Sequence, residues 1–238
     1  MDLASEAGDD GEMSGTDHDL EAMSDEGRRL WAAALAVNRS CRAVTSRPPL
    51  PPLLFFTDPE RTPEPWRVAG RLPAGRNGAA GVVYRHFGAA DARETAQRLR
   101  EVTARRGVRL LIGQDADLAE AVGADGTHLP QRDLWRAPEL RRRMPGTLIT
   151  GAFHAGAELD EAVAAALDAL VVSPVFSAGG GSPKRPSLGP EGLAALAAAL
   201  PLPVYGLGGV DAETAQGLIG TGAGGLAAVD GIVSAFGE

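Results

Sequence analysis

The sequence predicts a single (β/α)8 TIM barrel preceded by a disordered acidic N-terminal tail. Three observations lead there: eight short apolar runs, Ala- and Leu-rich helical segments between most of them, and a length of 238 residues that suits one such barrel. Continuous apolar strands are typical of a parallel sheet that is covered on both faces. At this length a closed barrel is favoured over an open doubly wound sheet.

Residues 1–27 form the predicted tail. The first 26 residues carry ten Asp and Glu and no Lys or Arg, which leaves 21 acids against 23 bases in the rest of the chain. The tail has few large apolar side chains, so burial cannot offset the conformational entropy lost on ordering. We expect a solubilising extension; a regulatory or partner-binding role is the alternative.

Residues 28–52 connect the tail to the barrel, which is expected over residues 53–238. Apolar spacing predicts a short amphipathic helix at Arg28–Asn38, and the segment Ser46–Pro52 reads as a stiff proline spacer. The chain after the last strand is too short for a full outer helix. We therefore expect the Arg28–Asn38 helix to cover part of that gap or to close the bottom of the barrel.

The remaining elements alternate along the chain. Helices are expected at residues 89–105, 159–167, 190–200 and 211–219, and Pro190 suits the first turn of the third of these. The eight strands are expected at residues 53–58, 81–87, 108–113, 125–129, 146–154, 168–176, 202–209 and 224–230.

Composition excludes several classes of protein. Cys41 is the only cysteine, so no internal disulfide is possible and a reducing compartment, the cytoplasm, is expected. No apolar run is long enough to cross a bilayer, and the acidic N-terminus is the reverse of a secretion signal. Neither a basic excess nor aromatic interleaving supports nucleic-acid binding.

The polar residues of interest gather at the carboxyl ends of the expected strands, where barrel enzymes place their chemistry. Arg85 ends an apolar strand, so it requires a partner or a bound anion. His128 is expected to be a core histidine, whereas Gly208 and Gly209 before a helix suit phosphate binding. Lys184, the only lysine, lies in a Gly-rich loop that reads either as a mobile lid or as a disordered surface loop.

Five segments together carry a family resemblance: LLFFTDPER, GADGTHLPQRDL, SPVF followed by a lysine, LPVYGLGGV and GAGGLAAVDGI. They resemble the thiamine phosphate synthase family, including its thiazole tautomerase-like branch, in the right order from Leu53 to about Ile232. The resemblance implies a (β/α)8 barrel that joins a hydroxymethylpyrimidine diphosphate to a thiazole phosphate and releases diphosphate with the help of Mg²⁺. Small phosphorylated substrates are thus the implied partners, and oligomeric state is left unpredicted.

The resemblance also implies roles for individual residues. Catalytic roles fall to Arg85, Lys184 and His154, and metal binding to Asp133 together with Asp115 or Gln114. Substrate and phosphate binding fall to Arg85, Gln131, Lys184, Gly208, Gly209, Asp230 and Gly231.

Several positions depart from the family pattern. Phe87 replaces a basic residue, Gln114 a metal-binding carboxylate, Ala152 a serine, and Asp230 a serine near the expected phosphate. Two alternatives therefore stay open beside the synthase. One is a thiazole tautomerase-like isomerase with His154 as its acid and base. The other is a catalytically inactive phosphate-binding paralogue with a regulatory role.

Overall fold

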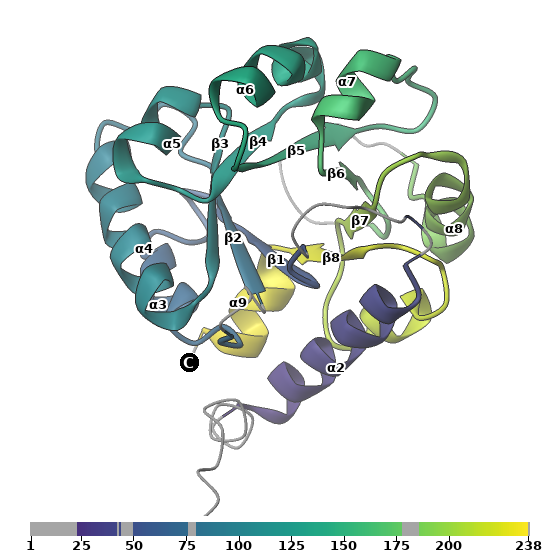
Figure 1. The fold of residues 1–238 in the computed structure, drawn as a ribbon. Coiled ribbons are helices and arrows are strands. Elements are labelled where there is room, and N and C mark those ends of the chain that lie inside the picture. Colours follow the sequence, from purple (N-terminus) through teal and green to yellow (C-terminus); the bar gives the residue numbers. More distant parts are fainter. Residues whose placement is uncertain (1–22, 42, 44–49, 76–79, 178–185, 238) are drawn as a thin grey trace, which may run out of the picture.

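The computed structural model describes residues 23–41, 43, 50–75, 80–177 and 186–237 (Figure 1). Its strands are β1 Leu53–Phe56, β2 Ala80–Tyr84, β3 Arg109–Gly113, β4 Gly126–Leu129, β5 Leu148–Phe153, β6 Ala169–Val172, β7 Val204–Leu207 and β8 Gly225–Ala228. Each strand pairs in parallel with the next, and β8 pairs with β1, so the sheet is a closed barrel. The predicted (β/α)8 architecture is confirmed.

Alternate residues of the strands face opposite sides of the barrel wall, and both sides are buried. Leu54 and Phe56 belong to the cluster inside the barrel, whereas Leu53 and Phe55 pack outward against the helices. The inner cluster comprises Leu54, Phe56, Val83, Leu111, Leu148, Ala169, Val171, Tyr205 and Ala227. Burial on both faces explains why the strands read as continuous apolar runs rather than as alternating ones.

The α-helices are α2 Asp25–Arg39, α3 Pro65–Ala69, α4 Ala92–Arg106, α5 Ala116–Val122, α6 Ala137–Arg143, α7 Glu161–Ala166, α8 Gly189–Ala199 and α9 Asp230–Phe236. Two 3-10 helices, η1 Gln131–Arg136 and η2 Thr214–Leu218, complete the described part of the chain. The helix expected over residues 211–219 is thus only the short η2, because the Asp211 carboxylate accepts from the N–H groups of Glu213 and Thr214 and forms a turn there. None of the helices in these ranges is long and apolar enough to cross a membrane.

Helix α2 begins three residues before the predicted helix and corrects the boundary of the tail. Ser24 caps it by accepting a hydrogen bond from the Gly27 N–H at 2.9 Å, and Met23 is buried. Residues 23–27 therefore belong to the folded body, while the first 22 residues of the expected tail lie outside the described part. Helix α2 contacts α9, η2 and β8 on the outside of the barrel, so it covers the gap left by the short C-terminal helix (Figure 1).

Replacing Ser24 by alanine is expected to lower the free energy of unfolding by about 1–2 kcal/mol. The serine hydroxyl caps α2 and also donates to the Ala235 carbonyl at 2.9 Å, so the variant loses two hydrogen bonds. Urea denaturation measures the loss. Ser24→Asp keeps the cap but loses the hydroxyl donor, so its free energy of unfolding should lie between those of the parent and Ser24→Ala. An unchanged midpoint for Ser24→Ala would show that this cap does not stabilise the junction.

Candidate functional site

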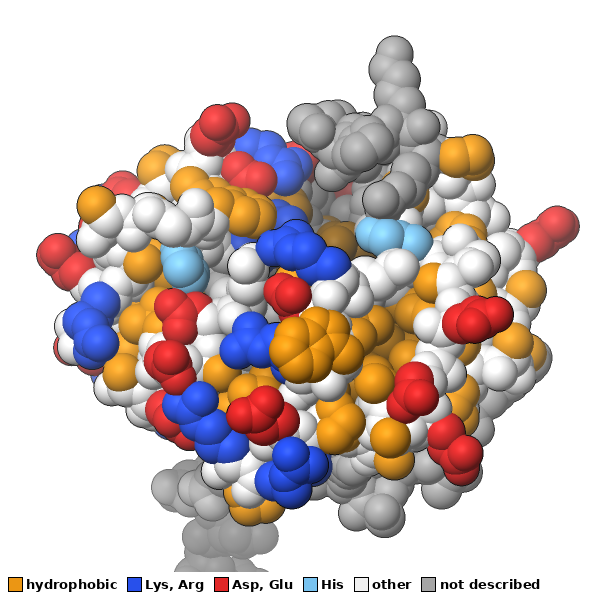
Figure 2. All heavy atoms as spheres, turned by 90° about the horizontal axis from the view of Figure 1, so that it is seen from above, with side chains coloured by type: hydrophobic (Ala, Val, Ile, Leu, Met, Phe, Trp, Pro, Cys, Tyr) orange, Lys and Arg blue, Asp and Glu red, His pale blue; other side chains and the backbone are white. Residues whose placement is uncertain are grey.

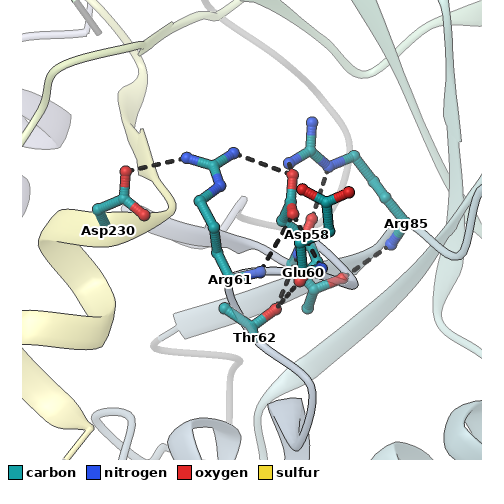
Figure 3. Close-up of polar contacts among 7 residues, drawn as sticks. Asp58, Glu60, Arg61, Thr62, Arg85 and Asp230 are labelled. Carbon is teal, nitrogen blue, oxygen red and sulfur yellow. Dashed lines mark hydrogen bonds and ion pairs between the residues drawn. The ribbon is translucent and has the colours of Figure 1, made fainter. Parts of the chain in front are cut away.

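Arg85 is held rigidly where β2 ends at the mouth of the barrel (Figure 3). Its backbone N–H donates to the Thr57 hydroxyl at 2.9 Å, and its Nε donates to the Thr57 carbonyl at 2.8 Å. The guanidinium carbon lies 5.5 Å from the ring centre of Phe56 and 5.4 Å from that of Phe87. The two hydrogen bonds to Thr57 and the buried Phe56 ring thus fix the direction in which the guanidinium points, and the Phe87 ring lies close by.

The Nη2 atom of Arg85 is buried and has no hydrogen-bond partner among the described residues. The nearest carboxylate oxygen, Oδ2 of Asp58, is 3.9 Å away, which is beyond hydrogen-bond distance. Burial lowers the pKa of the guanidinium below its ordinary value; Asp58 partly opposes this effect and Arg61 adds to it. A buried donor without a partner costs free energy, so Nη2 requires an explanation, and an anion bound beside Arg85 would provide one.

A chain of charges crosses the mouth from β1 to β8 (Figure 3). Arg61 donates to Asp58 at 3.0 Å and to Asp230 at 2.9 Å, so it links the loop after β1 with the first residue of α9. Burial raises the pKa of Asp58, but hydrogen bonds from Arg61 and Glu60 lower it below its ordinary value overall. Asp230, at a position where the resemblance implies a serine, therefore has Arg61 as its cationic partner.

His128 lies inside the barrel and not on the mouth. It is 7% exposed, its Nδ1 is 2.9 Å from the Thr150 hydroxyl, and its ring meets Phe56 edge-on at 5.0 Å between centres. Burial, with a smaller effect from Arg85, lowers the pKa of His128 from 6.5 to about 3. The prediction of a satisfied core histidine is confirmed.

His154 and Gln131 join neighbouring strand ends. The Gln131 side-chain oxygen accepts from the His154 backbone N–H at 2.8 Å, and the His154 Nδ1 donates to the Ser173 carbonyl at 3.3 Å. The structure thus brings the ends of β4, β5 and β6 together through these two residues. Because a carbonyl oxygen only accepts, the His154 Nδ1 is the donor in this contact.

The residues after β3 do not build a metal site. Oδ1 of Asp115 caps α5 by accepting from the Leu118 N–H at 2.8 Å. Its other oxygen faces His86, whose Nδ1 accepts from the Gly88 N–H; the His86 Nε2 therefore carries a proton and cannot bind a cation. Gln114 offers only a neutral amide.

Asp133 is the remaining carboxylate of the predicted metal set, and it lies on η1 with Arg132 3.8 Å away. Among the described residues no group of three or more His, Cys, Asp or Glu side chains is arranged to hold a metal ion. The residues present therefore do not fit a Mg²⁺ site built by the protein alone.

Gly208 and Gly209 adopt positive φ angles of 99° and 63°, which favour glycine. A Cβ on Gly209 would also lie 2.7 Å from the Cβ of Phe176, so the loop after β7 packs closely on the loop after β6. Within the described residues, neither glycine N–H has a backbone acceptor. Gly231 has a packing reason as well, because its Cβ would lie 2.2 Å from the Val210 carbonyl oxygen. Lys184 lies outside the described residues.

Two contacts of the mouth went unrecognised in the sequence, although the residues that make them, Thr57 and Arg61, stand at and just after the end of the first expected strand. Thr57 anchors Arg85 by its hydroxyl and carbonyl, and only its place at the end of a strand pointed to it. Arg61 pairs with a residue 169 positions away, a contact that no local pattern signals. On the described part of the face shown in Figure 2, acidic and basic side chains are interleaved rather than gathered into a patch of one sign.

Three comparisons with known proteins all find thiamine phosphate synthases similar to this chain. A family model described as thiamine monophosphate synthase matches residues 54–232. The thiamine-phosphate synthase of Chloroflexus aurantiacus is 34% identical over 161 residues, which span 66% of this chain and 74% of that protein. That of Chlorobium luteolum is 30% identical over 191 residues, 79% of this chain and 88% of the relative. The thiamine phosphate pyrophosphorylase structure from Pyrococcus furiosus covers 77% of this chain and 91% of its own, with a TM-score of 0.63 and 24% identity, and shows the shared fold.

Proposed function

Because the chain belongs to the thiamine monophosphate synthase family, we propose that it is a transferase of thiamine biosynthesis that joins hydroxymethylpyrimidine diphosphate to a thiazole phosphate. In this reaction the bond between the pyrimidine methylene carbon and the diphosphate oxygen breaks. A bond forms from the same carbon to the thiazole nitrogen, and diphosphate leaves. The isomerase and inactive-paralogue alternatives are not favoured, because the named relatives are synthases.

The observation that carries the proposal is the unfilled Nη2 donor of Arg85. Negative charge grows on the diphosphate oxygens as it departs, and a donor already fixed in place stabilises that charge without reorganising. The two hydrogen bonds to Thr57 hold the guanidinium ready for this role. Arg85 thus binds the diphosphate and supports its departure.

The other residues divide the remaining work in this proposal. Gly208 and Gly209 offer backbone N–H groups to the thiazole phosphate, and Gly231 keeps the end of β8 packed against the loop that follows β7. The side-chain amide of Gln131 and the ring of His154 line the same mouth, and Asp230 acts by positioning Arg61. Lys184 is the proposed second cation on the diphosphate. We propose that the reaction takes place in the cytoplasm, a reducing compartment that suits the free thiol of Cys41.

Mg²⁺ is proposed to bind together with the substrate diphosphate and not to a site that the protein forms by itself. Mg²⁺ keeps several waters and commonly binds through one or two carboxylates plus substrate phosphates. Asp133 lies in the first turn of η1, directly after β4, and its carboxylate is 3.8 Å from Nε of Arg132. Asp115 is committed to the cap of α5, so Asp133 is the proposed protein contact.

The test is turnover of the purified full-length chain with hydroxymethylpyrimidine diphosphate, thiazole phosphate and Mg²⁺. We expect diphosphate and thiamine phosphate to appear in equal amounts. Replacing Asp133 by asparagine should lower turnover at least tenfold at limiting Mg²⁺, with partial recovery at high Mg²⁺, because the ion loses its carboxylate.

Asp115→Ser is the matched control, since serine also caps helices and only the carboxylate charge is removed. It should leave the Mg²⁺ dependence unchanged. If turnover at limiting Mg²⁺ fell strongly in Asp115→Ser and not in Asp133→Asn, Asp115 would be the residue that contacts Mg²⁺. No product from the parent chain at any Mg²⁺ concentration would reject the synthase function.

A further inference from the structure

Phe87, three residues beyond the end of β2, is unusual in two respects. Its side chain is 68% exposed although it is a large aromatic residue. Its backbone has φ of 47°, in the left-handed region that bulky residues rarely adopt. Gln114 is the other non-glycine residue with positive φ in the described ranges. Both exposure and backbone strain cost free energy, and residues of this kind cluster at ligand sites.

The core does not account for the placement of Phe87. Phe56, which also contacts the Arg85 guanidinium, is 1% exposed and packs inside the barrel, whereas most of the Phe87 side chain is exposed. Arg85 does not depend on Phe87 for its position, because two hydrogen bonds to Thr57 and the ring of Phe56 already fix it. The exposed ring is thus available for something other than holding the arginine.

Geometry connects Phe87 with the anion site. The Phe87 ring centre lies 5.4 Å from the guanidinium carbon of Arg85, whose buried Nη2 has no partner among the described residues. An anion that fills this donor brings the atoms next to it within reach of the exposed ring. The guanidinium carbon, at 5.4 Å, already lies within the 4.5–7 Å over which aromatic rings stack, so a planar ring joined to an anion beside Arg85 comes within stacking range of Phe87.

We propose that Phe87 stacks on the planar heterocycle of the substrate whose diphosphate binds to Arg85, and so selects a heterocyclic diphosphate over inorganic diphosphate. This specificity role rests on the proposed function, which supplies the pyrimidine ring. At position 87 the chain has an aromatic side chain where the family resemblance implies a basic one. Phe87 contacts the ring and not the reacting atoms, so its effect falls on binding.

Binding measurements separate the two parts of the ligand. Isothermal titration of the full-length chain is carried out with hydroxymethylpyrimidine diphosphate and, separately, with inorganic diphosphate. The parent should bind the pyrimidine compound more tightly. Phe87→Leu should lose about tenfold of that affinity, the usual size of one stacking contact, and keep its affinity for inorganic diphosphate. Phe87→Tyr should keep both.

Phe87→Asn separates stacking from backbone strain, because asparagine tolerates positive φ. It should melt at a higher temperature than Phe87→Leu and lose the same affinity for the pyrimidine compound. Equal losses for both ligands in Phe87→Leu would mean that Phe87 only supports Arg85, and unchanged affinities would leave Phe87 without a role. Either result overturns the proposal, as does a parent that binds the two ligands equally.

The stacking role of Phe87 and the proposed synthase reaction can be tested separately. A parent that shows the ring preference and its loss in Phe87→Leu, yet forms no thiamine phosphate, keeps the stacking role and rejects the synthase reaction. If the parent forms thiamine phosphate and Phe87→Leu binds both ligands as the parent does, the synthase reaction stands and the stacking role is rejected. A parent that binds neither ligand overturns both.

Discussion

Replacing Arg85 by alanine is expected to lower turnover with hydroxymethylpyrimidine diphosphate and thiazole phosphate by about 10²–10³-fold, the usual cost of removing one fixed donor from a site of developing charge. The guanidinium is held by Thr57, lies close to the rings of Phe56 and Phe87, and keeps a buried Nη2 without a partner among the described residues. Steady-state release of diphosphate measures the effect. Arg85→Lys should recover little, because lysine cannot reproduce the fixed fork of the guanidinium.

Arg98→Ala is the matched control for Arg85→Ala. Arg98 also stacks on an aromatic ring, with its guanidinium carbon 4.0 Å from the ring centre of Trp66, but it lies on α4 outside the barrel. Its removal should leave turnover unchanged.

Stability provides a second readout for Arg85. Desolvation lowers the pKa of its guanidinium, so the buried charge is not well compensated in the folded protein. Residues that serve binding often reduce stability. The free energy of unfolding of Arg85→Ala should therefore equal or exceed that of the parent. Strong destabilisation with retained turnover would instead make Arg85 a structural residue.

The strands and the main features of the mouth could be predicted because each depends on local sequence. A strand buried on both faces reads as a continuous apolar run, and the first charged residue after such a run, as with Arg85 after β2, has to lie at the barrel mouth. His128 was predictable for a related reason, since the run that contains it is buried on both sides.

The rest depends on contacts between distant segments. The ion pair between Arg61 and Asp230 exists only because β8 closes on β1, so the sequence alone suggested an uncompensated anion at Asp230. The commitment of Asp115 to a helix cap could not be told from metal binding, because an aspartate at a strand end can do either. Helix α2 began earlier than its apolar spacing indicated, since Ser24 and Met23 are held by the C-terminal helix region and the core.

The stability of the protein is expected to fall steeply between pH 6.5 and pH 3 because of His128. Its pKa is lowered to about 3 in the folded protein and returns to its ordinary 6.5 on unfolding. In this window the unfolded chain binds one proton more than the folded chain, so the free energy of unfolding rises with pH. The contribution is fully present above pH 6.5 and is lost at about 1.4 kcal/mol per pH unit below it, roughly 3 kcal/mol by pH 4.5.

Urea denaturation at pH 7, 5.5 and 4.5 measures this loss, and His128→Asn provides the comparison. The variant should be less stable at pH 7, since it loses the packing against Phe56 and the contact with the Thr150 hydroxyl. It should nevertheless lose about 3 kcal/mol less than the parent between pH 7 and pH 4.5, because it has no imidazole to protonate. Parallel pH profiles for the two proteins would show that His128 is protonated in the folded barrel. Arg85→Ala should shift the His128 titration upward, because the positive charge of Arg85 is the second cause of the lowered pKa.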